Sequence, residues 1–326
     1  METETKLDSA LSLAERDKLE SLERLIQNFT YQVTPFAPST QNPPSLKGID
    51  IYGVSLPHSG IMGGDLLVYV DFKRDYNLKA RIAAAKAAIV PERDDDPKAK
   101  IVERLRSIRS QTGILLADVS GHLLTDAALS TALYVAFTSG IFSELDDFGE
   151  ITTRLFENLN KSIYMQLGSS KMTTLLYGEI SEQGRFRFLS AGHLPPLIYS
   201  QQFDKFVKIE EDRLHSFPPI GSMPTDTDID KPETPGKRWQ SPLGYKKRYS
   251  VNELNLMGHG DILLLYTDGV TEQRRGDDYY AETRLEAAMR EFKHLPARDL
   301  AAALGEDLLN FGSQDDDISF VIIKKS

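Results

Sequence analysis

The stretch GDILLLYTDGVTE, residues 260–272, joins an apolar run to a carboxylate that stands directly at its exit. The consecutive apolar residues 262–266 predict a buried β-strand. Asp268 follows with Gly269 behind it, so its carboxylate is expected at the edge of a sheet, partly removed from water. A single Asp-Gly pair is more often a turn than a ligand. This stretch therefore predicts a ligand only in combination with similar stretches elsewhere in the chain.

Three more aspartates stand at strand ends in the same manner. They are Asp65 in GGDLL, Asp118 in ADVSGH, and Asp316 within the acidic run 315–317 before ISFVII. Carboxylates that converge at one edge repel one another and raise each other's pKa unless cations neutralise them. Oxygen ligands without cysteine favour Mg²⁺ or Mn²⁺ over zinc. Two such ions about 3.5–4 Å apart can activate a water molecule for in-line attack on a phosphate ester.

The composition narrows the class of protein. The 326 residues include no cysteine, 38 Lys or Arg and 48 Asp or Glu, which gives a net charge of −10. Disulfides, iron–sulfur clusters and a thiolate nucleophile are therefore excluded. The acid excess argues against nucleic acid as a partner. Since no apolar stretch approaches about 18 residues and the start lacks a secretory pattern, we expect a cytoplasmic protein without a membrane span.

Strand and helix patterns alternate along most of the chain. We expect strands at 48–56, 65–72, 113–119, 172–180, 184–192, 195–200, 261–268 and 317–323. We expect two helices between 77 and 110, and further helices at 123–139, 146–167, 282–292 and 297–310. This mixture predicts an α+β domain in which helices cover sheets that are stacked face to face.

The first 44 residues differ from the rest. Leu19, Leu22, Ile26 and Phe29 recur at helical spacing, so residues 8–29 predict a helix. The Pro-rich stretch 35–44 reads as a linker to a domain at 45–326. The helix either packs on its own domain or acts as a dimerising, regulatory element, and the sequence favours neither. Two long segments, 73–111 and 224–249, read as insertions and as candidate surfaces for partners.

The motifs GGD, DVSGH, TTLLYGEI, GRFRFLSAGHLPPLIY, GDILLLYTDGVTE and DDDISFVI occur in one order from Gly48 to Lys325. In this order they resemble the metal-dependent type-2C protein phosphatases, and more narrowly the bacterial branch of the sporulation stage II protein E and the sigma-factor-regulating phosphatases. The resemblance implies a four-layer α-β-β-α sandwich of two antiparallel sheets, with two Mn²⁺ or Mg²⁺ ions at one edge.

The resemblance also implies a role for each matching residue. Asp65, Asp118, Asp268 and Asp316 would bind the metals, with Asp118 bridging both ions and the carbonyl of Val119 adding an oxygen. Asp317 is a weaker candidate, because strand alternation points it the other way. His122 is either a proton donor or a residue that orders the turn. His193 and Ser120 more readily serve a loop and a cap than catalysis.

Some positions depart from the family pattern. Val68 stands where the family commonly has a further aspartate, Leu123 stands where it has glycine, and we find no arginine near the first strand to hold phosphate. The four main ligands remain. We therefore predict a phosphatase that acts on phosphoserine or phosphothreonine in a signalling protein, of the type of an anti-sigma-factor antagonist. The alternative is a phosphatase fold with weakened catalysis that serves as a scaffold or a dimeric adaptor.

Overall fold

The computed structural model describes residues 42–58, 63–89, 96–119, 124–167, 171–210, 213–228, 241, 243–256 and 258–326. The predicted helix at 8–29 and its linker to residue 41 lie outside the described residues, as do Ser120, His122 and Leu123. The architecture that follows concerns the unit from Pro38 to Ser326.

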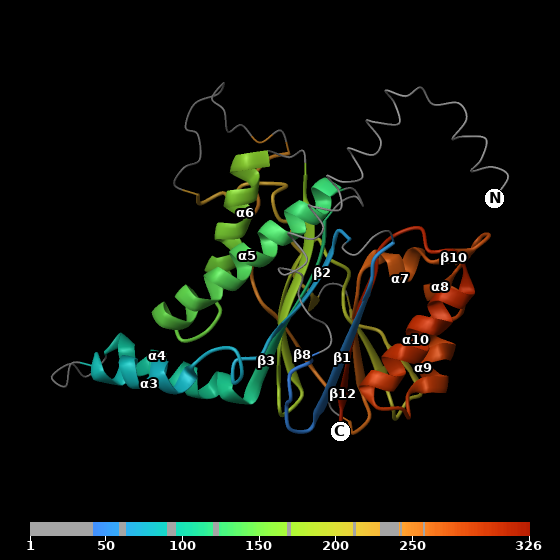
Figure 1. The fold of residues 1–326 in the computed structure, drawn as a ribbon, viewed down its shortest axis with the longest axis horizontal. Coiled ribbons are helices and arrows are strands. Elements are labelled where there is room, and N and C mark those ends of the chain that lie inside the picture. Colours follow the sequence, from blue (N-terminus) through green and yellow to red (C-terminus); the bar gives the residue numbers. More distant parts are fainter. Residues whose placement is uncertain are drawn as a thin grey trace, which may run out of the picture. The chain divides into compact units, whose positions relative to one another are not determined.

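Two five-stranded antiparallel sheets form the centre of this unit (Figure 1). Sheet 1 has the order β1-β12-β9-β6-β7, and sheet 2 has the order β2-β3-β4-β5-β8. The strands of sheet 1 are β1 (Ile49–Leu56), β6 (Leu197–Ser200), β7 (Lys205–Val207), β9 (Ile262–Tyr266) and β12 (Ile318–Lys325). Those of sheet 2 are β2 (Asp65–Val70), β3 (Gln111–Val119), β4 (Thr173–Ser181), β5 (Arg185–Ala191) and β8 (Asn252–Asn255).

The helices lie on the outer faces of the two sheets. Beside sheet 2 lie α3 (Leu78–Ala87), α4 (Pro97–Ser107) with a short 3₁₀ turn (Ile108–Ser110), α5 (Leu124–Asp147) and α6 (Thr153–Leu167). Beside sheet 1 lie α7 (Asp268–Glu272), α8 (Tyr280–Thr283), α9 (Leu285–Phe292) and α10 (Ala297–Phe311), with a small hairpin of β10 (Arg274–Arg275) and β11 (Asp278–Tyr279). The predicted α+β sandwich is confirmed.

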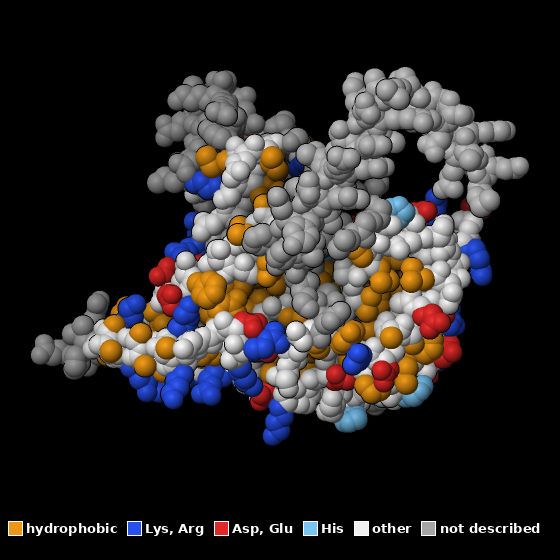
Figure 2. Space-filling view, viewed as in Figure 1, with side chains coloured by type: hydrophobic (Ala, Val, Ile, Leu, Met, Phe, Trp, Pro, Cys, Tyr) orange, Lys and Arg blue, Asp and Glu red, His pale blue; other side chains and the backbone are white. Residues whose placement is uncertain are grey.

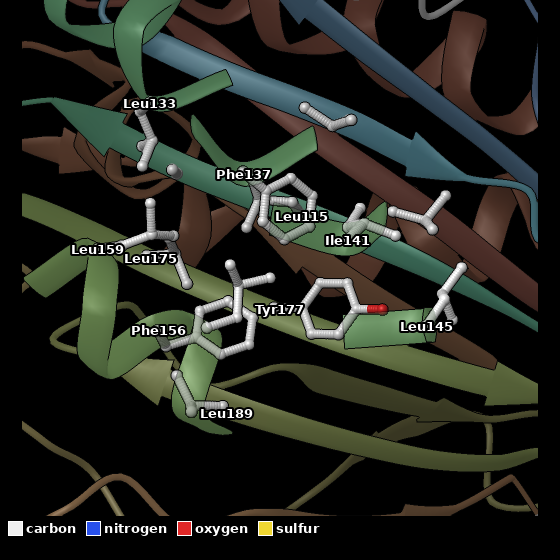
Figure 3. Close-up of a cluster of buried hydrophobic side chains, with 14 of the residues drawn as sticks. Leu115, Leu133, Phe137, Ile141, Leu145, Phe156, Leu159, Leu175, Tyr177 and Leu189 are labelled. Atoms are coloured by element: carbon white, nitrogen blue, oxygen red, sulfur yellow. The ribbon is translucent and has the colours of Figure 1, made fainter. Parts of the chain in front are cut away.

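Three clusters of buried apolar side chains hold the layers together. One lies between sheet 2 and α5–α6, where Phe137, Phe156 and Tyr177 pack ring against ring (Figure 3). A second lies between sheet 1 and helices α9 and α10. The third fills the space between the sheets and includes Leu67, Leu116 and Leu263. Because side chains alternate along a strand, each sheet contributes to two of the clusters.

Helix α5 is longer than its sequence pattern suggested. We expected it to end at Ser139, with the next helix beginning at Asp146, but α5 runs on to Asp147 and α6 begins at Thr153. Gly140 lowers the intrinsic helix propensity by only about 1 kcal/mol. Ile141 and Leu145 in the extension are fully buried. Their burial stabilises the additional turns more than the glycine disfavours them.

Within the described residues, one stretch of α5, Ala128–Asp147, is long and apolar enough to cross a membrane by length and composition alone. The sequence pattern had led us to expect no such stretch. Leu133, Phe137, Ile141 and Leu145 recur at helical spacing and are at most 2% exposed against sheet 2. Packing into the core therefore accounts for the apolar character of this face of the helix, whereas Val135 and Phe142 elsewhere on it are 42% and 48% exposed.

The segment 224–249 is anchored where the structure describes it. Glu157 of α6 accepts hydrogen bonds from the Thr225 hydroxyl (2.5 Å), the Lys246 ammonium (2.9 Å) and the Tyr249 amide (2.6 Å). Lys246 is only 3% exposed, and its Nζ lies 3.4 Å from the centre of the Tyr249 ring. Our expectation of a wholly unpacked loop is wrong for these two ends. Residues 229–240, including Trp239, lie outside the description.

Candidate metal centre

Asp65 and Asp118 face each other across neighbouring strands. Asp65 opens β2, Asp118 lies near the end of β3, and the antiparallel register places them directly opposite one another. Residues that are paired in this way point to the same face of a sheet. The hydroxyl of Thr267, the residue directly after β9 of sheet 1, donates to Asp65 Oδ2 at 2.8 Å. The pair therefore lies at the open end of the space between the two sheets.

Asp268 and Asp316 approach this place from sheet 1. Asp268 begins α7 two residues after β9 ends, and Asp316 stands two residues before β12 begins. These strands are antiparallel neighbours with Tyr266 opposite Phe320, so the exit of one lies beside the entrance of the other. The ends of the two sheets thus place these four sequence-distant aspartates at the same edge of the sandwich.

The electrostatics show that these carboxylates share one environment. Burial first, and then the charges of Asp268 and Asp316, raise the pKa of Asp118 to about 7. Burial and Asp118 raise the pKa of Asp65 well above its usual range, although hydrogen bonds from Thr267 and Ser319 oppose the shift. Burial, followed by Glu272 and Asp316, raises the pKa of Asp268. No cationic side chain is among the main influences on these three groups.

Partly desolvated carboxylate oxygens are the donor set that Mg²⁺ and Mn²⁺ prefer. The residues present therefore fit such ions in chemistry. Across the described ranges, however, no three His, Asp or Glu side chains are gathered tightly enough to hold an ion as they stand. Asp65, Asp118, Asp268 and Asp316 would have to draw together on binding, with the Val119 carbonyl at the end of β3 beside them.

Asp317 has a different task from Asp316. Its side chain is buried at 4% exposure and accepts hydrogen bonds from the backbone amides of His58 (2.7 Å) and Gly64 (2.6 Å). A β-carbon on Gly63 would lie 2.1 Å from Asp317 Oδ2, and one on Gly269 would lie 2.0 Å from the Asp317 carbonyl. The glycines of both motifs therefore permit Asp317 to fasten the GGD turn to the start of β12.

His193 lies beside the centre without facing it as a ligand. It is 6% exposed, and burial lowers the pKa of its imidazole to about 4. Its Nδ1 is 2.9 Å from the hydroxyl of Thr174, the residue opposite Asp118 on β4. Its backbone carbonyl accepts a hydrogen bond from Ser190 at 3.0 Å. These contacts agree with the expected role in fixing a loop.

The structure shows where Val68 and Arg274 lie relative to the candidate metal centre, which the sequence alone did not. Val68 faces the cluster beneath the helices, on the opposite face of β2 from Asp65. A larger polar side chain at position 68 would therefore enter that core.

On the other side of the centre, a pocket of about 290 Å³ is lined by Gly269, Glu272, Gln273, Arg274, Tyr279, Asp315 and Asp316. Arg274 lies far in sequence from the first strand, where we had looked for an arginine.

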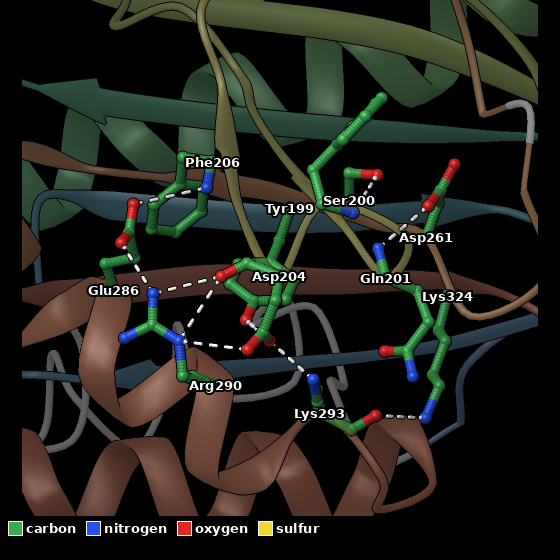
Figure 4. Close-up of polar contacts among 11 residues, drawn as sticks. Tyr199, Ser200, Gln201, Asp204, Phe206, Asp261, Glu286, Arg290, Lys293 and Lys324 are labelled. Carbon is green, nitrogen blue, oxygen red and sulfur yellow. Dashed lines mark hydrogen bonds and ion pairs between the residues drawn. The ribbon is translucent and has the colours of Figure 1, made fainter.

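A second polar cluster contrasts with this centre (Figure 4). Asp204 accepts hydrogen bonds from Tyr199 and Lys293, both at 2.5 Å, and pairs with Arg290 at 3.2 Å. The Lys293 and Tyr199 hydrogen bonds lower the pKa of Asp204. Tyr199 pairs with Ile262, the first residue of β9, so this cluster lies at the opposite end of sheet 1 from Asp268. Its charges are compensated, and it fastens β7 to α9.

Comparison with known proteins agrees with this geometry. The model of the family Stage II sporulation protein E (SpoIIE) matches residues 109–326, about two thirds of the chain. The chain belongs to the SpoIIE family. The resemblance drawn from its motifs is thereby confirmed, and Asp118, Asp268 and Asp316 all fall within the matched region.

Individual relatives share little sequence identity with this chain. The phosphoserine phosphatase RsbU of Bacillus subtilis (strain 168) is 22% identical over 223 residues, which cover 67% of this chain and 56% of RsbU. The crystal structure of the RsbU and RsbW domains of Rv1364c from Mycobacterium tuberculosis matches with a TM-score of 0.60 at 20% identity, over 89% of this chain and 63% of that one. The SiaA-PP2C domain of Pseudomonas aeruginosa matches with a TM-score of 0.59 at 14% identity, over 94% of this chain and 98% of that one. These likenesses confirm the type-2C phosphatase fold.

Proposed function

We propose that this member of the SpoIIE family is a Mn²⁺- or Mg²⁺-dependent phosphatase that hydrolyses phosphoserine or phosphothreonine in a protein. The observation that carries the proposal is the set of four aspartates at one edge of the sandwich, where burial, and after it the repulsion between carboxylates, raises the pKa of three members. The phosphoserine phosphatase activity that names the relative RsbU supports the same reaction.

Some residues of this chain would bind the cations, and others fix the positions of those ligands. Asp65, Asp118, Asp268 and Asp316 would bind two ions, with Asp118 between them. When bound, such ions lower the pKa of water and offset the charge of a phosphate ester. Thr267 orients Asp65 by its 2.8 Å hydrogen bond, and Asp317 fixes the GGD turn through the Gly64 amide. Since no side chain is needed as a nucleophile, the lack of cysteine agrees with this reading.

The test is metal-titrated hydrolysis of p-nitrophenyl phosphate and of a phosphoserine peptide. We expect turnover that requires Mn²⁺ or Mg²⁺ and that falls at least about 100-fold in Asp118→Asn and Asp268→Asn, since removing a group that stabilises the transition state commonly lowers the rate by this factor. Asp299→Asn, an exposed position on α10, is the matched control. No turnover with either metal, or equal rates in all three variants, would refute the proposal.

The scaffold alternative draws on one observation, the lack of a tightly gathered ligand set among the described residues. Calorimetry with Mn²⁺ separates the two readings. A working centre binds Mn²⁺ with a heat that Asp118→Asn abolishes, whereas a degenerate centre gives no site-specific heat in either protein.

We further propose an anti-sigma-factor antagonist, or a protein like it, as the phosphorylated substrate. The support is the name of the relative RsbU and the joint occurrence of RsbU and RsbW domains in the M. tuberculosis protein. Release of phosphate from such a phosphoprotein, at a kcat/KM well above that for an unrelated phosphoprotein, is the expected result. Equal values for both would contradict this substrate class.

A further inference from the structure

The connection between β2 and β3 is far longer than the fold requires. These strands are antiparallel neighbours, and such pairs are usually joined by about 2–5 residues. Here residues 71–110 intervene, and they form α3, α4 and the 3₁₀ turn. The match to the SpoIIE family begins only at residue 109. We call residues 71–110 the α3–α4 arm.

The arm carries the opposite charge to the rest of the protein. Between Asp71 and Ser110 there are eleven Lys or Arg and seven Asp or Glu, a net charge of +4. The remaining residues of the chain therefore carry −14. Three of the seven acids, Asp94 to Asp96, cluster between the two helices, so the positive charge concentrates on α3 and α4 themselves.

Part of this positive charge fastens the arm, and part faces solvent. Arg81 pairs with Asp146 at the end of α5 at 3.1 Å, and Arg104 pairs with Glu150 in the loop after α5 at 3.2 Å, so both hold the arm to this region. Four other cations are exposed and, within the described residues, have no ion pair: Lys79, Lys86, Arg106 and Arg109. Figure 2 shows Lys and Arg side chains gathered along one edge of the molecule, over α3 and α4.

The exposed surface of the arm offers charge without large apolar groups. Leu78, Ile101 and Leu105 are buried against the core beneath the helices. The exposed positions of α3 between the cations are alanines. No large apolar side chain in the described part of the arm is strongly exposed. A surface of this kind has little to insert into a bilayer, since interfacial helices need Trp, Phe or Leu on one face.

We propose that the α3–α4 arm docks an acidic surface of the phosphoprotein substrate, a proposal that rests on the proposed phosphatase function. The four unpaired cations supply electrostatic attraction over roughly a Debye length, about 8 Å at physiological salt. The rest of the chain, at −14, repels extended polyanions such as nucleic acid. A local acidic patch on a protein can meet the arm without covering that body.

The test uses two peptides with the same phosphoserine core, joined through a flexible Gly-Ser linker of about 20 residues to either eight Glu or eight Gln. Such a linker spans roughly 25 Å on average. The arm variant is Lys79→Glu, Lys86→Glu, Arg106→Glu and Arg109→Glu. The matched control, Arg185→Glu, Lys205→Glu, Lys208→Glu and Lys247→Glu, makes the same change of net charge at exposed positions elsewhere.

In the natural chain we expect the Glu peptide to bind at least tenfold more tightly than the Gln peptide by fluorescence anisotropy, and to have a lower KM with an unchanged kcat. The arm variant should lose this preference and the control should keep it, while both hydrolyse p-nitrophenyl phosphate normally. A second arm variant with Gln at the four positions should lose part of the preference, which excludes a folding defect as the cause.

Other outcomes overturn the docking proposal. These are equal affinity of the natural chain for both peptides, equal loss in the control, and binding of phosphatidylglycerol vesicles or self-association that depends on the arm in place of peptide binding. If p-nitrophenyl phosphate is not hydrolysed at all, the phosphatase proposal fails, and the anisotropy measurement still decides whether the arm binds acidic protein.

Discussion

At the scale of single residues, Asp118 shows how a candidate ligand is held in an unfavourable state until a cation arrives. It lies between Asp65 on β2 and Thr174 on β4, at the end of the space between the sheets. Burial raises the pKa of its carboxyl group from the usual 3.8 to about 7. The charged form therefore opposes folding unless a cation compensates it.

This shift predicts how stability depends on pH in the metal-free protein. Below about pH 4 Asp118 is protonated in both the folded and the unfolded state, so it imposes no penalty. Between pH 4 and 7 the unfolded chain releases its proton first, and the folded state loses stability as the pH rises. We expect Asp118→Asn to raise the free energy of unfolding at pH 8 by up to about 4 kcal/mol, and hardly at all at pH 4.

Urea unfolding in a chelating buffer at both pH values measures this difference, with Asp299→Asn as control. Adding Mn²⁺ should reverse the order of stability, because only the natural centre gains binding energy from the ion. A difference between Asp118→Asn and the natural chain that does not change with pH would contradict the interpretation.

Glu157 is a second residue whose role is set entirely by its surroundings. It is the ion-pair partner of the buried Lys246, and burial lowers the pKa of that lysine. Removing one member of a buried pair leaves the other uncompensated, which usually destabilises a protein by about 3–5 kcal/mol. We expect this loss in Glu157→Ala by chemical unfolding. Glu210→Ala, at an exposed position, should change stability by less than about 0.5 kcal/mol; a loss of that small size in Glu157→Ala would rule out the anchoring role.

At the scale of elements, α5 combines a membrane-like composition with the packing of a core helix. Phe137 is fully buried and contacts the rings of Phe156 and Tyr177 at centroid distances of 6.2 and 5.5 Å. Val135, two residues earlier, is 42% exposed. A helix that is apolar because it belongs to the core should be sensitive to substitution on one side only.

We therefore expect Phe137→Ala to lower the free energy of unfolding by about 3–5 kcal/mol, as cavities in aromatic cores do. Val135→Ala should change it by less than about 1 kcal/mol. Thermal unfolding without detergent measures both. Similar losses at the two positions would indicate that the exposed side of α5 is also covered.

At the scale of the whole molecule, the role of the first 44 residues stays a prediction. If residues 8–29 dimerise the protein, deletion of residues 1–44 yields a monomer by light scattering at a concentration at which the full chain is a dimer. A changed rate towards p-nitrophenyl phosphate would add a regulatory role, since a helix can shift the population of the active state only through contacts that differ between states. A monomeric full chain would remove the dimerisation hypothesis.

The sequence by itself determined the α+β class, most strands, the order of the motifs and the four aspartates, because a buried strand of five apolar residues and an Asp at its exit are local patterns. It placed the end of α5 incorrectly and gave no sign of the anchored ends of segment 224–249. Tertiary packing decides both, through the burial of Ile141 and Leu145 and through Glu157.

Only the tertiary structure shows that Asp317 rather than Asp316 accepts the hydrogen bond from the Gly64 amide. It also shows that Val68 points away from Asp65 and that Arg274 lies beside the candidate centre. It also showed that the basic residues of 73–111 form an arm whose free cations face solvent. The physical reason is common to all of these cases. Local sequence fixes which face of a strand or helix a residue occupies, whereas charge compensation, burial and access depend on segments that meet only when the two sheets stack.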